Sequence, residues 1–217
     1  MTQAQPRGFL AAPPSGHGKG VLVLHAWWGL NDTIKDVCGL LARAGYTAFA
    51  PDLYHGKVVA TIPEAEALAK SLGKNPGQAH AEVAEAAAFL AGRASSDGGL
   101  AIVGFSLGAS YALDHSASDP DRIRSVVVFY GTTGGVDFST SRASYLGHFA
   151  EHDDFEERAY VDELEKTIHD AGRPVTFHHY PGTGHWFAEP DRTDAFNKAA
   201  ADLAWERTLA FLETAGR

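Results

Sequence analysis

The sequence has little sulfur and little positive charge. It contains one cysteine, Cys38, which excludes an internal disulfide. Cys38 lies in an amphipathic stretch, which favours a small apolar core residue over a reactive thiol. Lysine and arginine number 18 against 27 aspartate and glutamate residues, a formal net charge of −9. Because an acidic surface repels phosphate backbones and anionic lipid, we expect neither nucleic acid nor a membrane as a partner.

Long hydrophobic segments are missing as well. No apolar run approaches the ~20 residues that a membrane-spanning helix needs. The N-terminus lacks a cationic start followed by an apolar run of signal-peptide length, since residues 9–12 are cut short by Pro13 and Pro14. We therefore expect a cytoplasmic protein. The sequence leaves monomer and homodimer both open.

Segments typical of strands and of helices alternate along the chain, which predicts an α/β fold with a mostly parallel central sheet and helices on both faces. Residues 1–19 are rich in proline, glycine and glutamine and predict a segment that is loose or follows the sheet edge. Residues 20–217 predict a single domain, with little sequence to spare for a separate lid domain. The expected strands are 21–25, 46–50, 100–103, 123–130, 145–149 and 175–180, and the expected helices are 32–44, 63–72, 78–91, 156–171, 193–215 and one from 109.

The most informative motif is Gly-Phe-Ser-Leu-Gly at residues 104–108, which reads G-x-S-x-G. It follows an apolar strand segment and precedes a helix-favouring stretch. Strand, sharp turn and helix form the context in which this motif becomes a nucleophile elbow. The flanking glycines allow a tight turn and keep side chains away from the serine. We therefore expect the hydroxyl of Ser106 to stand exposed at the end of a strand as a nucleophile.

A serine hydroxyl needs a base within hydrogen-bond reach, and the base needs an acid that orients it. With this motif the acid and then the histidine follow the serine along the chain. His185 comes after a predicted strand in a glycine-rich turn, so we expect its imidazole to face the elbow. Asp153 and Asp154 both follow an earlier predicted strand, and spacing alone does not separate them.

Attack on an ester carbonyl creates an oxyanion, which needs backbone N–H donors. Leu107, directly after the nucleophile, supplies one at the start of a helix. The second is expected in the loop after an early strand, which contains Trp27. Its indole either lines the pocket or packs with other aromatic rings. The Gly/Ser/Thr-rich segment 131–141 either borders the site or is a plain surface loop.

Metal ligation is not indicated. His178 and His179 are adjacent on a predicted strand, so their side chains point to opposite faces and do not share an ion. We expect no metal and no cofactor.

From residue 21 onward the chain resembles the dienelactone hydrolase family of the α/β-hydrolase fold. The likeness rests on His-Ala-Trp-Trp-Gly-Leu-Asn at 25–31, Pro-Asp-Leu-Tyr at 51–54, the pentapeptide at 104–108, Tyr-Gly at 130–131 and Gly-His at 184–185. The resemblance implies that Asp153 is the acid of the triad. It also implies that the backbone amides of Trp27 and Leu107 are the oxyanion donors.

The chain makes three departures from the pattern that the resemblance implies. Type members of the family have a cysteine nucleophile where this chain has Ser106, and a glutamate where it has Ala26. They hold a substrate carboxylate with two arginines. One of these corresponds to about Glu189, and no arginine stands in residues 44–92, where the other is expected and Lys57 is a weak substitute. The departures favour a neutral ester or lactone over dienelactone itself.

The sequence thus predicts a serine hydrolase that cleaves small carboxylic esters or lactones through an acyl-enzyme on Ser106, His185 and Asp153. The same triad would serve a thioesterase or an acyltransferase. A non-catalytic ligand-binding protein with the hydrolase fold is the alternative from another class. The presence of all three triad side chains counts against that alternative.

Overall fold

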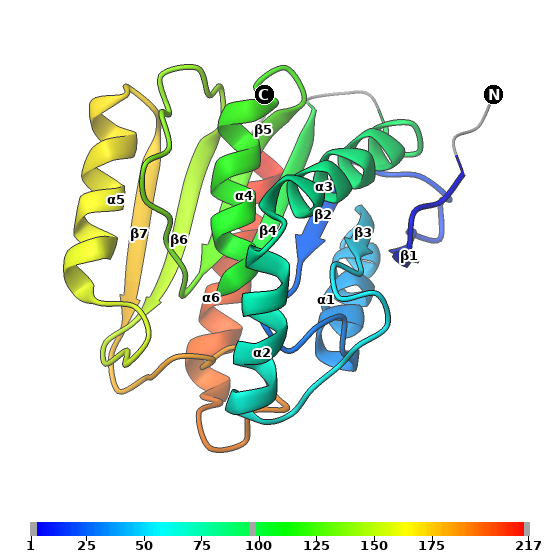
Figure 1. Cartoon of the computed structure of the whole chain (residues 1–217). Helices are drawn as coiled ribbons and strands as arrows, with labels where there is room; N and C mark the ends of the chain where they lie inside the picture. Colours follow the sequence, from blue (N-terminus) through cyan, green and yellow to red (C-terminus); the bar gives the residue numbers. More distant parts are fainter. Residues whose placement is uncertain (1–3, 96–98, 215–217) are drawn as a thin grey trace.

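A computed structural model describes residues 4–95 and 99–214. Within them the strands form one sheet in the order β1-β3-β2-β4-β5-β6-β7 (Figure 1). All neighbouring strands are parallel except β1, which runs antiparallel to β3 at one edge. The strands are β1 (Gly8–Ala11), β2 (Gly20–Leu24), β3 (Thr47–Pro51), β4 (Leu100–Phe105), β5 (Ile123–Phe129), β6 (Ser144–Ala150) and β7 (Val175–Tyr180).

The central strands are continuous apolar runs, as expected for strands covered on both faces. Every residue of β2 is buried, and so are the consecutive valines Val126, Val127 and Val128 of β5. The six strands predicted from the sequence are confirmed within one or two residues at each end. The segment predicted at 145–149 becomes β6, with all its residues buried except Ser144.

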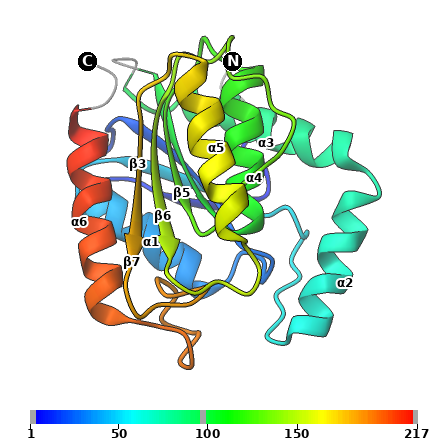
Figure 2. The same cartoon turned by 90° about the vertical axis from the view of Figure 1, so that its left-hand side faces the viewer.

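Helices cover both faces of the sheet, as predicted. Figure 2 shows α1 and α6 on one side and α3, α4 and α5 on the other. Helix α2 stands away from the sheet, and only Ala65 of its residues is buried. The helices are α1 (Asp32–Arg43), α2 (Ile62–Gly73), α3 (Pro76–Ala91), α4 (Leu107–Ser118), α5 (Arg158–Asp170) and α6 (Lys198–Thr214).

Near the two ends of the chain, the structure adds a strand and shifts the start of the last helix relative to the sequence prediction. Part of the N-terminal segment lies along the sheet edge as β1, where Gly8 pairs with Pro51 of β3. The closing helix begins at Lys198, so its predicted start at Thr193 is wrong. The side-chain oxygen of Asn197 accepts the N–H of Ala200 at 3.1 Å, which caps the helix there. The predicted end of this helix at residue 215 lies outside the described residues.

Two further expectations concern the interior and the helices. Cys38 is buried in α1, and burial raises the pKa of its thiol to about 12, in keeping with an apolar core residue. Among the helices of residues 4–95 and 99–214, none combines the length and the apolar character needed to cross a membrane.

Candidate active site

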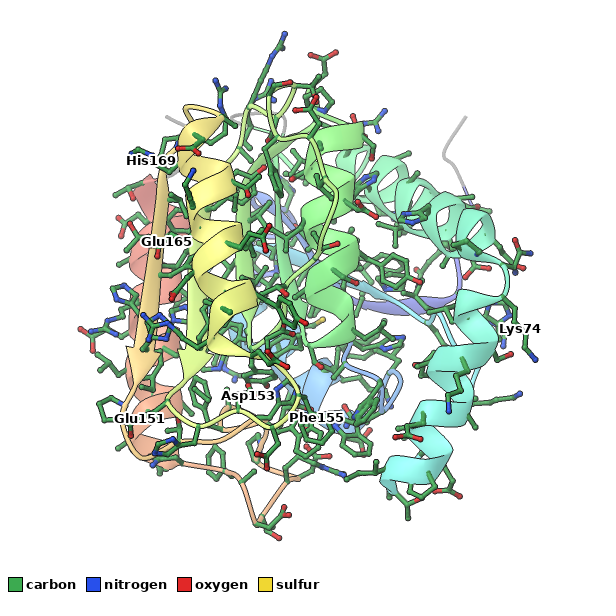
Figure 3. All side chains as sticks on the ribbon, turned by 60° about the vertical axis from the view of Figure 1, so that its left-hand side comes forward. Lys74, Glu151, Asp153, Phe155, Glu165 and His169 are labelled. Atoms are coloured by element: carbon green, nitrogen blue, oxygen red, sulfur yellow. The ribbon has the colours of Figure 1, made fainter. Side chains whose placement is uncertain are left out.

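The site lies at the edge where the parallel strands end. Ser106 follows β4, Asp153 follows β6 and His185 follows β7. Figure 3 labels Asp153 and Phe155 in the loop that leaves β6. Because the carboxyl ends of parallel strands meet at one edge, three segments distant in sequence reach the same place.

The turn at Ser106 places the unusual backbone angle on the serine itself, with φ 47° and ψ −113°. Its N–H donates to the carbonyl of Phe129 on β5 at 2.9 Å, which ties the turn to the sheet. The flanking glycines are needed for close approach. A Cβ on Gly104 would lie 2.5 Å from the carbonyl oxygen of Gly108, and one on Gly108 would lie 2.3 Å from that of Leu24.

Neither flanking glycine has a positive φ. The two glycines therefore allow the tight turn, as expected, through their missing side chains and not through a positive φ. Because Gly104 and Gly108 have no side chains, the start of α4 packs closely against β2 and β4. The strain of the turn, of order 1–3 kcal/mol, is carried by the residue that bears the hydroxyl.

The structure brings Ser106, His185 and Asp153 together. The Oγ of Ser106 lies 3.0 Å from Nε2 of His185, and Nδ1 of His185 lies 2.9 and 2.8 Å from the two carboxylate oxygens of Asp153. The side chains of His185 and Asp153 are 4% and 6% exposed. A proton on Nδ1 satisfies the carboxylate and leaves Nε2 as an acceptor for the serine hydroxyl.

Asp153 is also held from its own loop. Its Oδ1 accepts the backbone N–H groups of Phe155 and Glu156 at 2.9 and 3.0 Å. The neighbouring Asp154 is exposed. Of the two carboxylates that the sequence could not separate, Asp153 is therefore the one in contact with His185.

The two expected oxyanion donors, Trp27 and Leu107, come shortly after the neighbouring strands β2 and β4. Leu107 is the first residue of α4, so its N–H is one of the four that a helix leaves without an internal partner. Trp27 lies in the loop between β2 and α1. Its ring contacts Trp28, Trp186 and Phe155, with centroids 5.5, 6.0 and 5.6 Å apart. The indole therefore takes part in an aromatic cluster beside the triad.

Comparison with known proteins identifies the family. Residues 7–216 match the sequence model of the Dienelactone hydrolase family. The chain belongs to the dienelactone hydrolase family. It is therefore a hydrolase that acts on ester or lactone bonds. This excludes the alternative of a non-catalytic binding protein.

Alignments with related proteins extend over nearly the whole length of this dienelactone hydrolase family member. Over 214 residues it is 31% identical to Protein usf of Aquifex pyrophilus, covering 95% of this chain and 92% of that protein. It is 28% identical to a candidate carboxymethylenebutenolidase of Aquifex aeolicus, covering 96% and 93%. A crystal structure of a candidate dienelactone hydrolase from Klebsiella pneumoniae superimposes with a TM-score of 0.83 at 24% identity, covering 95% and 92%. That likeness shows the α/β-hydrolase fold.

A buried pair behind the histidine was not foreseen from the sequence of this family member. Tyr130 follows β5 with φ 38°, and its ring lies 4.9 Å from that of His185. Its hydroxyl donates to Oε1 of Glu189 at 2.8 Å. Burial raises the pKa of Glu189 to about 8 and that of Tyr130 well above its usual value. The position that the resemblance gives to an arginine is thus an enclosed carboxyl group.

Arg192 joins three loops around the candidate site, and the sequence did not predict this role. Its guanidinium lies over the ring of Trp28 at 4.2 Å. One nitrogen donates to Asp191 at 2.8 Å and another to the carbonyl of Ala60 at 3.2 Å. Asp191 in turn accepts the hydroxyl of Thr33 at 2.6 Å. The histidine loop is therefore fixed to the start of α1 and to the segment before α2.

The loop after β5 also borders the site. A Cβ on Gly131 would lie 2.4 Å from the carbonyl oxygen of Ser106. Beside it, the hydroxyl of Thr132 donates to a carboxylate oxygen of Glu156, whose pKa is raised, mainly by burial. The start of the 131–141 segment therefore lines the site, which settles the choice between border and plain surface loop for these two residues.

The two adjacent histidines of β7 lie on opposite faces of the sheet, as the alternation of a strand predicts. The ring of His178 lies 6.1 Å from His148, whereas that of His179 lies 5.9 Å from Phe149, on the other face. Over the described part of the chain, no group of three or more His, Cys, Asp or Glu side chains is placed to hold a metal ion.

Proposed function

We propose that this chain is a serine hydrolase that cleaves small, uncharged carboxylic esters or lactones through an acyl-enzyme on Ser106. The observation that carries the proposal is the continuous line of contacts from Ser106 Oγ to His185 Nε2 at 3.0 Å, and from His185 Nδ1 to Asp153. Each distance lies within the range needed for proton transfer or orientation.

The chemistry follows from this line. Nε2 of His185 takes the hydroxyl proton as Ser106 attacks the carbonyl carbon, and it then gives the proton to the leaving alcohol. Asp153 fixes the tautomer of the imidazole and stabilises its protonated form. The backbone amides of Leu107 and Trp27 donate to the oxyanion. Water activated by His185 then releases the acid and restores the serine.

The preference for an uncharged substrate rests on the charges around the site. Glu189 and the half-buried Glu156 contribute carboxyl groups, and no lysine or arginine takes the place of the two family arginines. Lys57 is exposed and lines a separate cavity of about 190 Å³ beside α2, together with Tyr54 and Glu82. A substrate carboxylate would therefore lose its hydration without gaining a cationic partner, which is costly in a poorly solvated site.

The test is covalent labelling combined with kinetics. A fluorophosphonate probe should label the wild-type protein and leave Ser106→Ala unlabelled. Hydrolysis of p-nitrophenyl acetate by Ser106→Ala should fall by a factor of roughly 10⁴ to 10⁶. Ser110→Ala is the matched control, because Ser110 lies in the first turn of α4 just after Ser106 but donates its hydroxyl to the carbonyl of Leu107 at 2.8 Å. Near-normal turnover by Ser106→Ala would overturn the proposal.

Product analysis then separates hydrolysis from acyl transfer. With an ester substrate and an excess of a competing alcohol, a hydrolase releases mainly the free acid. Predominant formation of the new ester would instead identify an acyltransferase that uses the same three side chains.

A further inference from the structure

Three aromatic side chains from three different loops converge on one side of His185. Trp27 follows β2, Phe155 follows β6 and Trp186 follows His185 itself. Ring centroids lie 4.8 Å apart for Phe155 and Trp186, 5.6 Å for Trp27 and Phe155, and 6.0 Å for Trp27 and Trp186. We call these three side chains the aromatic wall.

The aromatic wall touches the imidazole directly. The ring of Phe155 lies 5.1 Å from that of His185, and the ring of Trp186 lies 5.0 Å from it. Trp186 is buried, but Phe155 is 47% exposed. A half-exposed phenyl ring fixed against a functional imidazole leaves apolar surface available for a ligand.

Phe155 is held in this place by its backbone. Its N–H donates to Oδ1 of Asp153, the same carboxylate that contacts His185. Figure 3 shows Asp153 and Phe155 close together in the loop below β6. Because the contact to Asp153 uses the backbone N–H, the phenyl ring can be changed without removing that hydrogen bond.

Two of the three rings in the wall, those of Phe155 and Trp186, lie beside the imidazole. In the first half of the reaction, Nε2 of His185 must reach the oxygen of the departing alcohol, whereas the carbonyl oxygen faces the backbone N–H groups of Leu107 and Trp27. The alcohol part of the ester is therefore beside the imidazole, where Phe155 and Trp186 lie.

We propose that the aromatic wall is the subsite for the alcohol part of the substrate and that it selects an uncharged aromatic alcohol, such as a benzyl group. Flat rings stack or meet edge-to-face with Phe155 and the two indoles, and they cover the exposed face of the phenyl ring. The proposal rests on the serine hydrolase function proposed above, since it takes its direction from the proton transfer through His185.

The experiment compares esters whose alcohols have similar acidity, so that intrinsic reactivity does not decide the result. Benzyl acetate carries the ring on the alcohol, butyl acetate has no ring, and ethyl phenylacetate carries the ring on the acid. We expect the wild-type enzyme to have a higher kcat/KM for benzyl acetate than for butyl acetate. In Phe155→Ala this ratio should fall about five- to tenfold, the size of one lost aromatic contact.

Two further variants sharpen the result. Tyr160→Ala is the matched control, because Tyr160 is an aromatic residue of α5 that is 54% exposed and contributes no ring to the wall. It should keep the wild-type ratio. Phe155→Leu retains apolar volume without a flat ring, so it should lower the ratio even where Phe155→Ala fails to fold.

An unchanged ratio in both Phe155 variants would overturn the proposal, and so would a loss confined to ethyl phenylacetate. Labelling keeps this failure distinct from failure of the proposed function. A fluorophosphonate that labels the Phe155 variants on Ser106 reports an intact triad, so the subsite alone would then be wrong. Absence of labelling in the wild-type enzyme would instead remove the serine mechanism.

Discussion

The hydroxyl of Tyr130 donates a 2.8 Å hydrogen bond to Oε1 of Glu189, and both side chains are fully buried. The ring of Tyr130 also lies against His185, so this pair forms the support behind the imidazole. A carboxyl group enclosed in this way keeps its proton to unusually high pH, because burial opposes the charged form.

The first prediction concerns stability and pH. Burial raises the pKa of Glu189 from 4.5 to about 8, and nearby Asp191 adds to the rise while Tyr130 and Arg192 oppose it. Between these values the folded state holds a proton that the unfolded state has lost, so the free energy of unfolding falls as pH rises. At about 1.4 kcal/mol per pKa unit, the loss from pH 5 to pH 7 is on the order of 2–3 kcal/mol.

Glu189→Gln removes this titration and keeps an acceptor for Tyr130. Its free energy of unfolding should therefore change less between pH 5 and pH 7 than that of the wild type. Urea denaturation at the two pH values measures the difference. Parallel pH profiles for the two proteins would contradict an enclosed, protonated Glu189.

The second prediction separates the two neighbouring acids. Asp153→Asn should lower kcat by about 10⁴, because an amide in place of the carboxylate favours the wrong tautomer of His185. Asp154→Asn should stay within about twofold of the wild type, since Asp154 is exposed and takes no part in the contacts of His185. Steady-state kinetics on one activated ester measure the two kcat values. Equal losses of kcat in both variants would contradict the assignment of Asp153 as the acid that orients His185.

The third prediction tests close approach at the turn. Gly108→Ala places a methyl group 2.3 Å from a backbone carbonyl of Leu24, which cannot move without shifting β2. It should cost about 3 kcal/mol or more of unfolding free energy. The control is Gly39→Ala in α1, where the nearest atom is the flexible end of Arg43 at 3.4 Å.

Gly39→Ala should raise the unfolding free energy by about 0.5–1 kcal/mol, as alanine does in a helix interior. Thermal or urea unfolding should therefore show a lower unfolding free energy than the wild type for Gly108→Ala and a higher one for Gly39→Ala. Destabilisation by Gly39→Ala equal to that of Gly108→Ala would show that helix glycines are sensitive in general.

The fourth prediction concerns the loops around the site. Arg192→Lys keeps the charge but loses the planar group that lies over Trp28 while bonding Asp191 and Ala60. It should lower stability by about 1–2 kcal/mol. For a chain of this length that corresponds to a fall in Tm of several degrees.

Arg142→Lys is the control for the loss of an arginine as such. Arg142 pairs with Asp121, and their side chains are 61% and 84% exposed. Because exposed ion pairs contribute little, its melting temperature should match that of the wild type. Equal shifts in the two variants would mean that Arg192 has no special part in joining the loops.

The sequence predicted the parallel core well for a physical reason. Strands covered on both faces are continuous apolar runs, and β2 and β5 are of this kind. Strand β1 could not be predicted as a strand, because its four residues follow no such run and gain their structure by pairing with β3. The start of α6 was misplaced because the helix-favouring residues before it form turns that end at the cap of Asn197.

For the site, residues whose role follows from a motif were predicted, whereas contacts between distant segments were not. The serine and histidine have a local sequence signature, and Asp153 was selected only through the family resemblance. Tyr130 and Glu189 are 59 residues apart, and nothing in either neighbourhood indicates their contact. Phe155 stands in an acidic loop without periodicity, so its place beside His185 emerges only from the fold. The oxyanion role of Trp27 and Leu107 stays a prediction.

The backbone angle at Ser106 limits which amino acids the turn accepts. A side chain branched at its first carbon is strongly disfavoured at a φ of 47°, so threonine is a poor replacement although it also carries a hydroxyl. Cysteine has the same unbranched shape as serine. The turn therefore admits oxygen or sulfur on a single methylene group, and an exchange between the two leaves the scaffold unchanged.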